Sequence, residues 1–392
     1  MSVTTTPPVR AALWRKGDAP GDRKFLSIGD LSLESGEHLP DVVMAYETWG
    51  RLNAQRDNAI LVEHALTGDS HVVGDEGPGH PTAGWWPGLV GSGALLDSDE
   101  YFVVAVNVLG GCRGSTGPSS LAADGSPWGS RFPRLTIRDQ VQAEAKLADA
   151  LGVDVWRTVI GGSMGGMRTL EWVAGHPERV DTAIALASSG YATAEQIAWS
   201  QAQILAIRND PWFAGGDYYE HPQGPEVGLG IARRIAHVTY RSEPELAERF
   251  GRREQDETPG DAGRPRYAVE SYLDHHGTKL AGRFDANSYA VLSEAMNSHD
   301  IGRGRGGLSA ALAPFDGHLV LVPVDSDRLY PPRLSHEIGE AFPAAELRTI
   351  RSMVGHDGFL TETDQVASLL REVVSTRRDT GARRGTGHGY AV

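Results

Sequence analysis

A serine set between glycines is the part of this sequence best suited to covalent chemistry. Gly161-Gly162-Ser163-Met164-Gly165 follows an apolar segment and precedes the helix-like residues 167–172. The G-x-S-x-G pattern is typical of a nucleophile elbow, where the serine occupies a strained strand-to-helix turn that requires glycine neighbours. An ordinary glycine-rich turn between a strand and a helix has the same form, so Ser163 needs partners elsewhere in the chain.

A serine nucleophile needs an imidazole to accept its proton and a carboxylate to orient that imidazole. After a nucleophile elbow the acid comes first along the chain and the histidine second. The apolar segment 318–324 runs into Asp325-Ser326-Asp327, which places an acid at the end of a strand. Position alone favours Asp325 or Asp327 and does not decide between them.

Three histidines follow that acidic loop. His336 falls in a segment with a helical pattern, and His388 lies in the polar tail. His356 stands next to Gly355, in the last loop before the terminal helix. This placement selects His356 as the candidate general base over a plain surface histidine.

Strands and helices alternate in the parts of the chain that must position these residues. The alternation predicts an α/β fold, with a mainly parallel sheet and helices on both faces. The loops at the carboxyl ends of the strands would then build the site. We expect a hairpin of strands at 25–33 and 42–48, strands at 59–62, 101–106, 180–186, 318–324 and 347–350, a helix capped by Thr136, and helices at 332–342 and 363–375.

Helical patterns dominate the middle of the chain, at 192–208, 228–237, 243–250, 267–284 and 287–296. We therefore expect residues 189–313 to form a helical lid inserted into an α/β-hydrolase-like core made of 25–188 and 314–375. Residues 1–24 should form a flexible arm, 252–264 an exposed loop, and 376–392 a disordered tail.

Composition narrows the partners and the compartment. The formal net charge of −14 disfavours nucleic acid or an anionic membrane as the main partner. No apolar run approaches the roughly 20 residues of a membrane span, and no secretory signal is visible, so we expect a cytoplasmic protein. The single cysteine, Cys112, is expected to be a small buried thiol.

Three further motifs suggest other chemistry. The tandem His275-His276 lacks a surrounding ligand set, so we expect no metal site. The run 110–117 lacks the lysine that ends a phosphate-binding loop, and we expect it to shape the active-site tunnel instead. The arginine-glycine segment 302–307 could contact RNA or the phosphates of a ligand, but its position favours a connection between lid and core.

Taken together, these residues resemble the homoserine O-acyltransferases of the α/β-hydrolase fold, chiefly those that transfer acetyl. The resemblance covers nearly the whole chain, from Phe25 to Leu370. It rests on separated motifs at 64–68 (HALTG), 107–118 (NVLGGCRGSTGP), 161–166 (GGSMGG), 297–300 (NSHD), 326–331 (SDRLYP) and 355–359 (GHDGF).

The resemblance implies a Ser163, Asp327 and His356 triad, and so selects Asp327 over Asp325. It also implies an oxyanion hole from the backbone amides of Leu66 and Met164. The implied reaction is ping-pong: Ser163 takes an acetyl group from acetyl-CoA and passes it to the side-chain hydroxyl of homoserine, for methionine biosynthesis. Acetyl-CoA is then a co-substrate, and no permanently bound cofactor is expected.

A transferase must hold its acceptor and exclude water, and the resemblance names residues for this task. It places the homoserine carboxylate on Arg233 and Tyr240 and the ammonium on Asp357. By themselves, Arg233 and Arg234 are typical of a solvated basic pair on a helix, and Asp357 of a turn. The spacing to Tyr240 favours Arg233.

Residue types leave related activities open. No residue that the sequence identifies decides between acetyl and succinyl as the transferred group, or between homoserine and serine as the acceptor. An ester hydrolase could use the same triad. A non-enzymatic binding module is a third class that the triad makes improbable. The resemblance also implies a homodimer formed through the lid helices, although a lid could bury its apolar stripes on itself.

Overall fold

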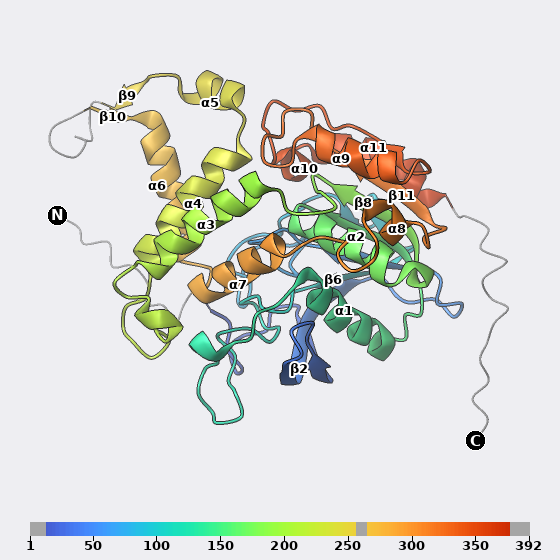
Figure 1. The fold of residues 1–392 in the computed structure, drawn as a ribbon, viewed down its shortest axis with the longest axis horizontal. Coiled ribbons are helices and arrows are strands. Elements are labelled where there is room, and N and C mark those ends of the chain that lie inside the picture. The colour runs from blue at the N-terminus through green and yellow to red at the C-terminus, as the bar shows by residue number, and fades with distance from the viewer. Residues whose placement is uncertain (1–12, 256–264, 377–392) are drawn as a thin grey trace.

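The computed structural model describes residues 13–255 and 265–376, and an eight-stranded sheet lies at its centre (Figure 1). The strand order is β1-β2-β6-β3-β7-β8-β11-β12. β1 and β2 form the expected antiparallel hairpin, β2 is antiparallel to β6, and the remaining neighbours are parallel. The strands are β1 (Lys24–Ser32), β2 (His38–Trp49), β3 (Ala59–Glu63), β6 (Phe102–Val106), β7 (Trp156–Gly162), β8 (Val180–Leu186), β11 (His318–Val322) and β12 (Glu346–Leu347).

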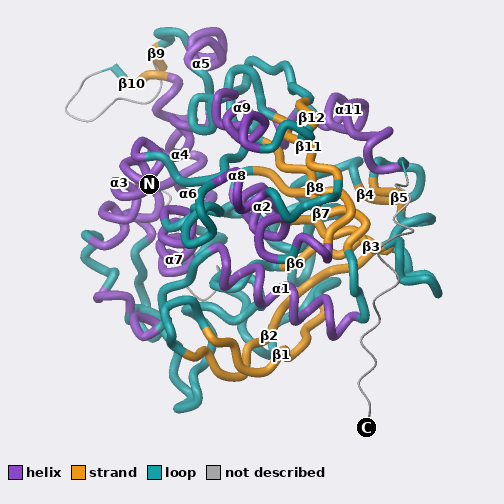
Figure 2. Tube along the Cα trace, turned by 45° about the vertical axis from the view of Figure 1, so that its right-hand side comes forward, coloured by secondary structure: helices purple, strands orange, loops and turns teal. Residues whose placement is uncertain are grey.

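Helices cover both faces of this sheet, as the alternating pattern predicted (Figure 2). Leu61 of β3 contributes to the core on one face, while its neighbours Ile60 and Val62 contribute to the core on the other. Both faces of a parallel strand are buried because helices lie on each side. One core includes α1 (Ile137–Leu151), α2 (Met164–Gly175), α8 (Leu308–Leu312) and α9 (Pro332–Ala341), and the other α10 (Gly358–Thr361) and α11 (Thr363–Ser375).

Helix α1 shows how local sequence fixes an element next to the site. Thr136 accepts a hydrogen bond from the Asp139 backbone N–H, and the Asp139 side chain accepts one from the Thr136 N–H. This reciprocal pair starts the helix, as the sequence predicted. Gly152, with φ of 73°, ends it in the left-handed conformation.

The helices α3 to α7 lie to one side of the sheet, at the left of Figure 1. Helix α4 packs against α3 and α6, and α3 also packs against α7. We propose that residues 189–313, which contain these helices, form the lid. The helices are α3 (Ala194–Arg208), α4 (Glu226–Tyr240), α5 (Glu243–Phe250), α6 (Ala268–Ala281) and α7 (Ala286–Asn297).

The beginning of the described chain is packed against the core, contrary to the flexible arm expected for 1–24. Leu13 is buried, and the Trp14 ring stacks on Phe25 at 4.5 Å between centroids. The buried Arg23 donates to the carbonyl of Gly79. Apolar surface on Leu13 and Trp14 favours this docking. The rest of the expected arm, 1–12, lies outside the described residues, as do 256–264 of the expected loop and 377–392 of the expected tail.

Several short elements differ from the sequence expectation. The strand expected at 347–350 is β12, Glu346–Leu347, and Ile350 only bridges to Val324. Two-residue strands are too short to give a periodic pattern. The structure adds β4 (Val90–Gly91), β5 (Leu96–Asp97), β9 (Glu254–Gln255), β10 (Arg266–Tyr267) and the 3-10 turns η2 (Gly129–Arg131), η3 (Pro177–Arg179) and η4 (Ala214–Gly216).

Two smaller expectations can be compared with the structure. Cys112 is buried, as predicted, and burial raises the pKa of its thiol to about 11. Within residues 13–255 and 265–376, no helix has both the length and the apolar character needed to cross a membrane.

Candidate active site

Ser163 lies at the sharp turn between β7 and α2. Its φ of 58° and ψ of −120° are unfavourable for a residue with a Cβ, which is the strain expected of a nucleophile elbow. A Cβ on Gly161 would lie 2.5 Å from the carbonyl carbon of Gly165, and one on Gly165 would lie 2.1 Å from the carbonyl oxygen of Glu63. The turn therefore requires glycine at both positions.

The structure brings Ser163, His356 and Asp327 together. The Ser163 hydroxyl lies 2.9 Å from His356 Nε2, in position to donate to it. His356 Nδ1 lies 2.7 Å from Asp327 Oδ2 and donates to that carboxylate. All three side chains are buried. This arrangement can withdraw the serine proton and stabilise the imidazolium that results.

The choice between the two acids follows from geometry. Asp327 Oδ1 accepts backbone N–H bonds from Leu329 and Tyr330, both at 2.8 Å, which orient its Oδ2 toward His356. The Asp325 carboxylate instead accepts the N–H of Ser352 at 3.0 Å. The structure therefore places Asp327 at the histidine, and His336 lies in α9 as the sequence predicted.

Opposing effects act on the protonation of His356. Burial lowers the pKa of the imidazole, but the negative charge and the hydrogen bond of Asp327 raise it, and the net pKa is above its ordinary value. Aromatic rings surround the imidazole: Tyr330 stacks on it at 5.0 Å, and Tyr240 and Phe359 lie at 5.7 and 5.5 Å. His356 is accordingly only 2% exposed.

The two amides expected to form the oxyanion hole lie on neighbouring elements. Met164 is the first residue of α2, where a helix has no internal acceptor for the N–H. Leu66 lies in the turn after β3, which the Gly68 N–H to Ala65 carbonyl bond closes at 2.9 Å. Since β3 and β7 are adjacent strands, both amides come from the same edge of the sheet.

A buried ion network supports this turn, and sequence analysis missed it. Arg168 Nη1 of α2 lies 2.6 Å from both Glu63 and Glu144, and its Nη2 donates to the His64 carbonyl at 2.7 Å. Burial raises the pKa of Glu63, although Arg168 opposes the shift. The Val108 N–H donates to His64 Nε2 at 3.0 Å. The network joins β3, α1, α2 and the Leu66 turn, and its sequence signal was the presence of Glu63 and Arg168 in largely apolar segments.

Arg233 of the lid points toward the Leu66 turn. Its Nη1 lies 3.4 Å from Thr67 Oγ1, and its guanidinium lies over the Tyr240 ring at 5.4 Å. Arg234 instead pairs with Asp274 of α6, with a shortest distance of 2.8 Å. The two arginines therefore point in different directions: Arg233 points toward the site, and Arg234 points toward α6, another helix of the lid.

Asp357 adjoins the site through its neighbour His356 but has a partner that the sequence did not predict. Its carboxylate lies 3.3 Å from Arg241 Nη2. Tyr240 and Arg241 are consecutive at the end of α4, so one helix end contacts both the imidazole and the acid. An ammonium ion binding at Asp357 would share the carboxylate with Arg241.

A second arginine near Thr67 was also missed. Arg283 Nη1 donates to the Thr67 carbonyl at 3.0 Å. Burial, together with the charges of Arg233 and Arg113, lowers the pKa of Arg283 to about 10, so it stays protonated at neutral pH. The side of the site next to Leu66 therefore carries positive charge suited to a carboxylate.

The arginines of segment 302–307 bind the protein itself. Arg303 donates to Glu34 at 2.8 and 2.9 Å, and Arg305 donates to Glu171 on α2. These pairs support a connection between lid and core, and they occupy the groups that would contact RNA or CoA phosphates. In segment 110–117, Gly110 and Thr116 are joined by a backbone bond of 2.8 Å, and Thr116 also bonds to Val43 of β2.

Comparisons with known proteins agree on family and fold. Residues 58–363 match the family model described as the alpha/beta hydrolase fold. The homoserine O-acetyltransferase of Thermobifida fusca (strain YX) is 58% identical over 380 residues, covering 96% of this chain and all of the relative. That of Mycobacterium bovis (strain BCG / Pasteur 1173P2) is 53% identical, covering 93% and 97%.

Solved structures include both transferases and hydrolases. Homoserine O-acetyltransferase from Bacillus anthracis superposes with a TM-score of 0.84 at 26% identity, covering 91% of this chain and 98% of that one. Esterase E22 superposes with a TM-score of 0.82 at 25% identity, covering 90% and 99%. Backbone similarity thus does not separate transfer from hydrolysis, whereas the two curated relatives at 58% and 53% identity are both homoserine O-acetyltransferases.

Proposed function

This chain belongs to the homoserine O-acetyltransferases of the α/β-hydrolase fold, and from that membership we propose that Ser163 carries the acetyl group during the reaction. The enzyme transfers an acetyl group to homoserine for methionine biosynthesis. The observation that supports the proposed route is the chain of hydrogen bonds from Ser163 through His356 to Asp327.

In the first half-reaction, His356 Nε2 takes the proton of Ser163 as Oγ attacks the thioester of acetyl-CoA. Asp327 stabilises the imidazolium through the 2.7 Å hydrogen bond to Nδ1. The N–H groups of Leu66 and Met164 would stabilise the tetrahedral oxyanion. Each such donor is typically worth about 2.7–4 kcal/mol of barrier. The proton on His356 then leaves with CoA, and Ser163 remains acetylated.

In the second half-reaction, the side-chain hydroxyl of homoserine occupies the place that CoA has left. His356 removes its proton, and the hydroxyl oxygen attacks the acetyl carbonyl to give O-acetyl-L-homoserine and free Ser163. The enzyme needs no permanently bound cofactor for either step, because acid–base and nucleophilic groups of the chain supply both.

Acceptor binding favours homoserine over water at the acetyl-enzyme. We propose that Arg233, with Tyr240, binds the carboxylate of homoserine and that Asp357 binds its ammonium group. The 3.4 Å contact of Arg233 with Thr67, next to Leu66, supports this placement. The rings around His356 limit competing hydrolysis.

The related activities that the sequence left open do not fit the curated relatives. Those relatives are homoserine O-acetyltransferases, which favours acetyl over succinyl and homoserine over serine. Hydrolysis of esters is a property of similar folds at 25% identity, well below the 53–58% of these relatives.

We also propose a homodimer formed through the lid and a cytoplasmic location. Five exposed, large hydrophobic side chains on α3 and α4 support the dimer: Ile197, Leu205, Val227, Ile231 and Val238. A second copy of the same surface would cover them. The buried Cys112, which has no other cysteine to pair with, fits a reducing compartment.

The test combines product analysis with trapping of the intermediate. Purified protein given acetyl-CoA and L-homoserine should release CoA and form O-acetylhomoserine, and acetyl-CoA alone should leave an acetyl group on the Ser163 peptide by mass spectrometry. Ser163→Ala should lose the adduct and reduce kcat by about 10⁶-fold, as in other serine-nucleophile enzymes. Full turnover by a folded Ser163→Ala protein would disprove the acyl-enzyme route.

A further inference from the structure

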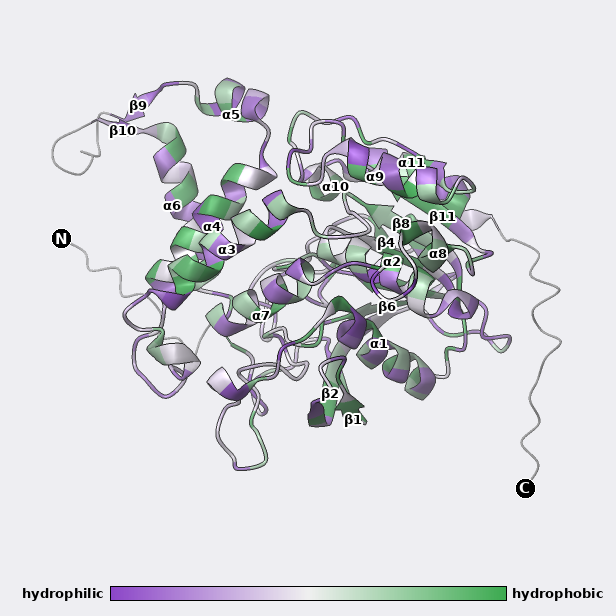
Figure 3. Cartoon of the chain, viewed as in Figure 1, coloured by the Kyte–Doolittle hydropathy of each residue, from purple (hydrophilic) through white to green (hydrophobic). Residues whose placement is uncertain are grey.

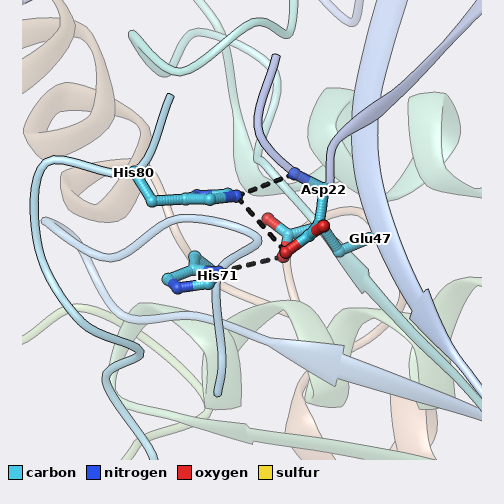
Figure 4. A group of neighbouring side chains, drawn as sticks. All are labelled: Asp22, Glu47, His71 and His80. Atoms are coloured by element: carbon cyan, nitrogen blue, oxygen red, sulfur yellow. Dashed lines mark hydrogen bonds and ion pairs between the residues drawn. The ribbon is translucent and has the colours of Figure 1, made fainter. Parts of the chain in front are cut away.

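Four side chains with metal-binding chemistry lie close together and include none of the proposed catalytic residues (Figure 4). Asp22 comes from the N-terminal segment, Glu47 from β2, and both His71 and His80 from the long loop between β3 and β4. One nitrogen or oxygen atom from each lies within 4.8 Å of the others. We propose that this group, called here the Glu47 cluster, binds one divalent transition-metal ion.

Hydrogen bonds around the cluster orient its atoms as outer partners do in metal sites. His71 Nε2 lies 3.2 Å from the Asp75 carbonyl, so a proton on Nε2 leaves the lone pair of Nδ1 directed into the cluster. Glu47 Oε1 accepts from Ser70 at 2.8 Å, and its Oε2 lies 3.0 Å from His71 Nδ1. In metal sites, a ligating histidine usually donates its other N–H to a carbonyl or carboxylate, and a ligating carboxylate is itself hydrogen-bonded.

His80 supplies the second imidazole. The Asp22 N–H donates to His80 Nε2 at 2.9 Å, so that nitrogen carries a lone pair and faces the cluster. The Asp22 carboxylate lies 3.9 Å from the same nitrogen. Glu47, His71 and His80 are only 1%, 3% and 5% exposed, whereas the Asp22 side chain is 85% exposed and free to approach an ion.

The donor set indicates the class of ion. Two imidazoles with two carboxylates suit Zn²⁺, Co²⁺ or Ni²⁺, whereas Mg²⁺ and Ca²⁺ prefer oxygen ligands alone. Metal–ligand bonds of about 2.0–2.1 Å in a tetrahedron give ligand separations of roughly 3.3 Å. The 3.0 Å between His71 and Glu47 fits that edge. The charges of Asp22 and Glu47 balance a dication.

Binding requires a local rearrangement of the rings. The imidazoles of His71 and His80 stack at 3.7 Å between centroids, with 16° between their planes. One ion cannot lie in both ring planes in that arrangement, so a ring must turn and His80 must exchange the Asp22 N–H for the metal. The competing occupant is a proton on His71, held between Glu47 and the Asp75 carbonyl.

An ion here would tie the start of the chain to the loop that carries the oxyanion turn. His71 follows Leu66 by five positions, and Asp22 precedes β1. The four ligands come from three segments that are separate in sequence, since His71 and His80 share one loop, so one ion would crosslink these segments. The proposed role of the ion is structural: it would hold these segments together and take no part in acetyl transfer.

The test uses the full-length protein, stripped with EDTA and desalted, then titrated with Zn²⁺ by calorimetry and with Co²⁺ by visible absorption. We expect one equivalent to bind, Co²⁺ bands typical of a low-coordinate nitrogen and oxygen site, and a Tm that rises with Zn²⁺ concentration. His80→Ala should abolish binding. Ser70→Ala, which removes an outer partner only, should weaken it by about 10–100-fold.

His275→Ala is the matched control, because His275 is an exposed histidine of a tandem pair. It should leave stoichiometry and affinity unchanged. Each variant is first checked for cooperative unfolding and for acetyl transfer, so that loss of binding is not loss of fold. Absence of binding by the folded wild-type protein, or equal binding by wild type and folded His80→Ala, would show that the cluster holds only a proton.

Discussion

At the scale of single residues, the protonation of His356 decides when Ser163 can react. The imidazole accepts the serine proton only in its neutral form, and the carboxylate of Asp327 at 2.7 Å favours the charged form. The raised pKa of His356 therefore makes the neutral imidazole a stronger base, but it also reduces the fraction of the imidazole that is neutral at acidic pH.

We predict that kcat/KM for acetyl-CoA falls on the acid side with a midpoint above the ordinary histidine value of about 6.5. The sign follows because a raised pKa requires a higher pH for the imidazole to become neutral. Asp327→Asn removes the negative charge, so the midpoint should move to lower pH while the plateau falls by about 10⁴-fold. A pH–rate profile of both proteins measures this, and an unshifted midpoint in the variant would contradict the role of Asp327.

Arg233 offers a second prediction at this scale. Arg233→Ala should raise KM for homoserine by about 10–100-fold, because a charge-assisted hydrogen bond is worth about 1.5–3 kcal/mol. Acetylation of Ser163 by acetyl-CoA should be unchanged. Arg234→Ala is the control, since Arg234 pairs with Asp274 instead. Initial rates at varied homoserine distinguish the two, and equal effects would refute the assignment of Arg233.

Sequence was informative about these residues where chain order restricts the choice. Ser163 and His356 follow from a turn motif and from loop placement, but Asp325 and Asp327 could not be separated by position. Backbone N–H groups from Leu329 and Tyr330 decide between them, and such contacts have no sequence signature. Arg283, which contacts Thr67, and Arg241, which contacts Asp357, were missed because each comes from a distant segment.

At the scale of elements, the approach of α2 to β3 sets the geometry of the elbow. The carbonyl oxygen of Glu63, the last residue of β3, would lie 2.1 Å from a Cβ on Gly165. The side chain of the same Glu63 is bound by Arg168 of α2. The start of α2 therefore cannot move away from β3 without breaking a buried ion pair.

We predict that Gly165→Ala lowers the free energy of unfolding by about 1–3 kcal/mol or more, because the new methyl group meets a backbone atom that cannot give way. Acetyl transfer should fall with it, since Met164 and Ser163 adjoin the displaced residue. Urea unfolding and steady-state rates measure the two effects.

Gly282→Ala is the control for that substitution. Gly282 has φ of −77°, and a Cβ there would meet nothing closer than 3.6 Å. Its stability should be unchanged or increase by about 0.4–1 kcal/mol through the unfolded state. A Gly165→Ala protein as stable and active as Gly282→Ala would mean that the close approach to β3 is not a constraint.

Elements were predictable where patterns were long. The strand at 180–186, the capped start of α1 and the terminal helix 363–375 all match, because periodicity and capping residues are local signals. The strands β4, β5, β9 and β10 are pairs of residues stabilised by their partners, and the docking of residues 13–24 depends on the surface that they meet. A local sequence pattern predicts neither the two-residue strands nor this docking.

At the scale of the whole molecule, apolar surface is concentrated on the lid. In Figure 3 the ribbons of α3 and α4 include strongly hydrophobic positions, and the exposed fractions of Ile231, Val238 and Val227 are 43%, 37% and 69%. The chain has a net charge of −14, so two copies repel each other over most of their surfaces. The exposed hydrophobic patch on α3 and α4 therefore favours association through this patch alone.

We predict that the protein is a dimer and that Ile231→Asp converts it to a monomer, because a charge would be buried in the lid interface. Light scattering at low micromolar concentration measures the mass. Leu121→Asp is the control, since Leu121 is 63% exposed and lies outside the lid. A wild-type monomer, or a dimer lost equally in both variants, would contradict association through the lid.

The 193 positions that separate Ser163 from His356 have a consequence for the protein as it is being made. Ribosomes add roughly 5–20 residues per second, so the elbow precedes its base by about 10–40 s. During that interval the lid is still being synthesised, and Ser163 has nothing to take its proton. The growing chain therefore consumes acetyl-CoA far more slowly than the finished enzyme, because full reactivity requires the last loop before the terminal helix to reach the sheet.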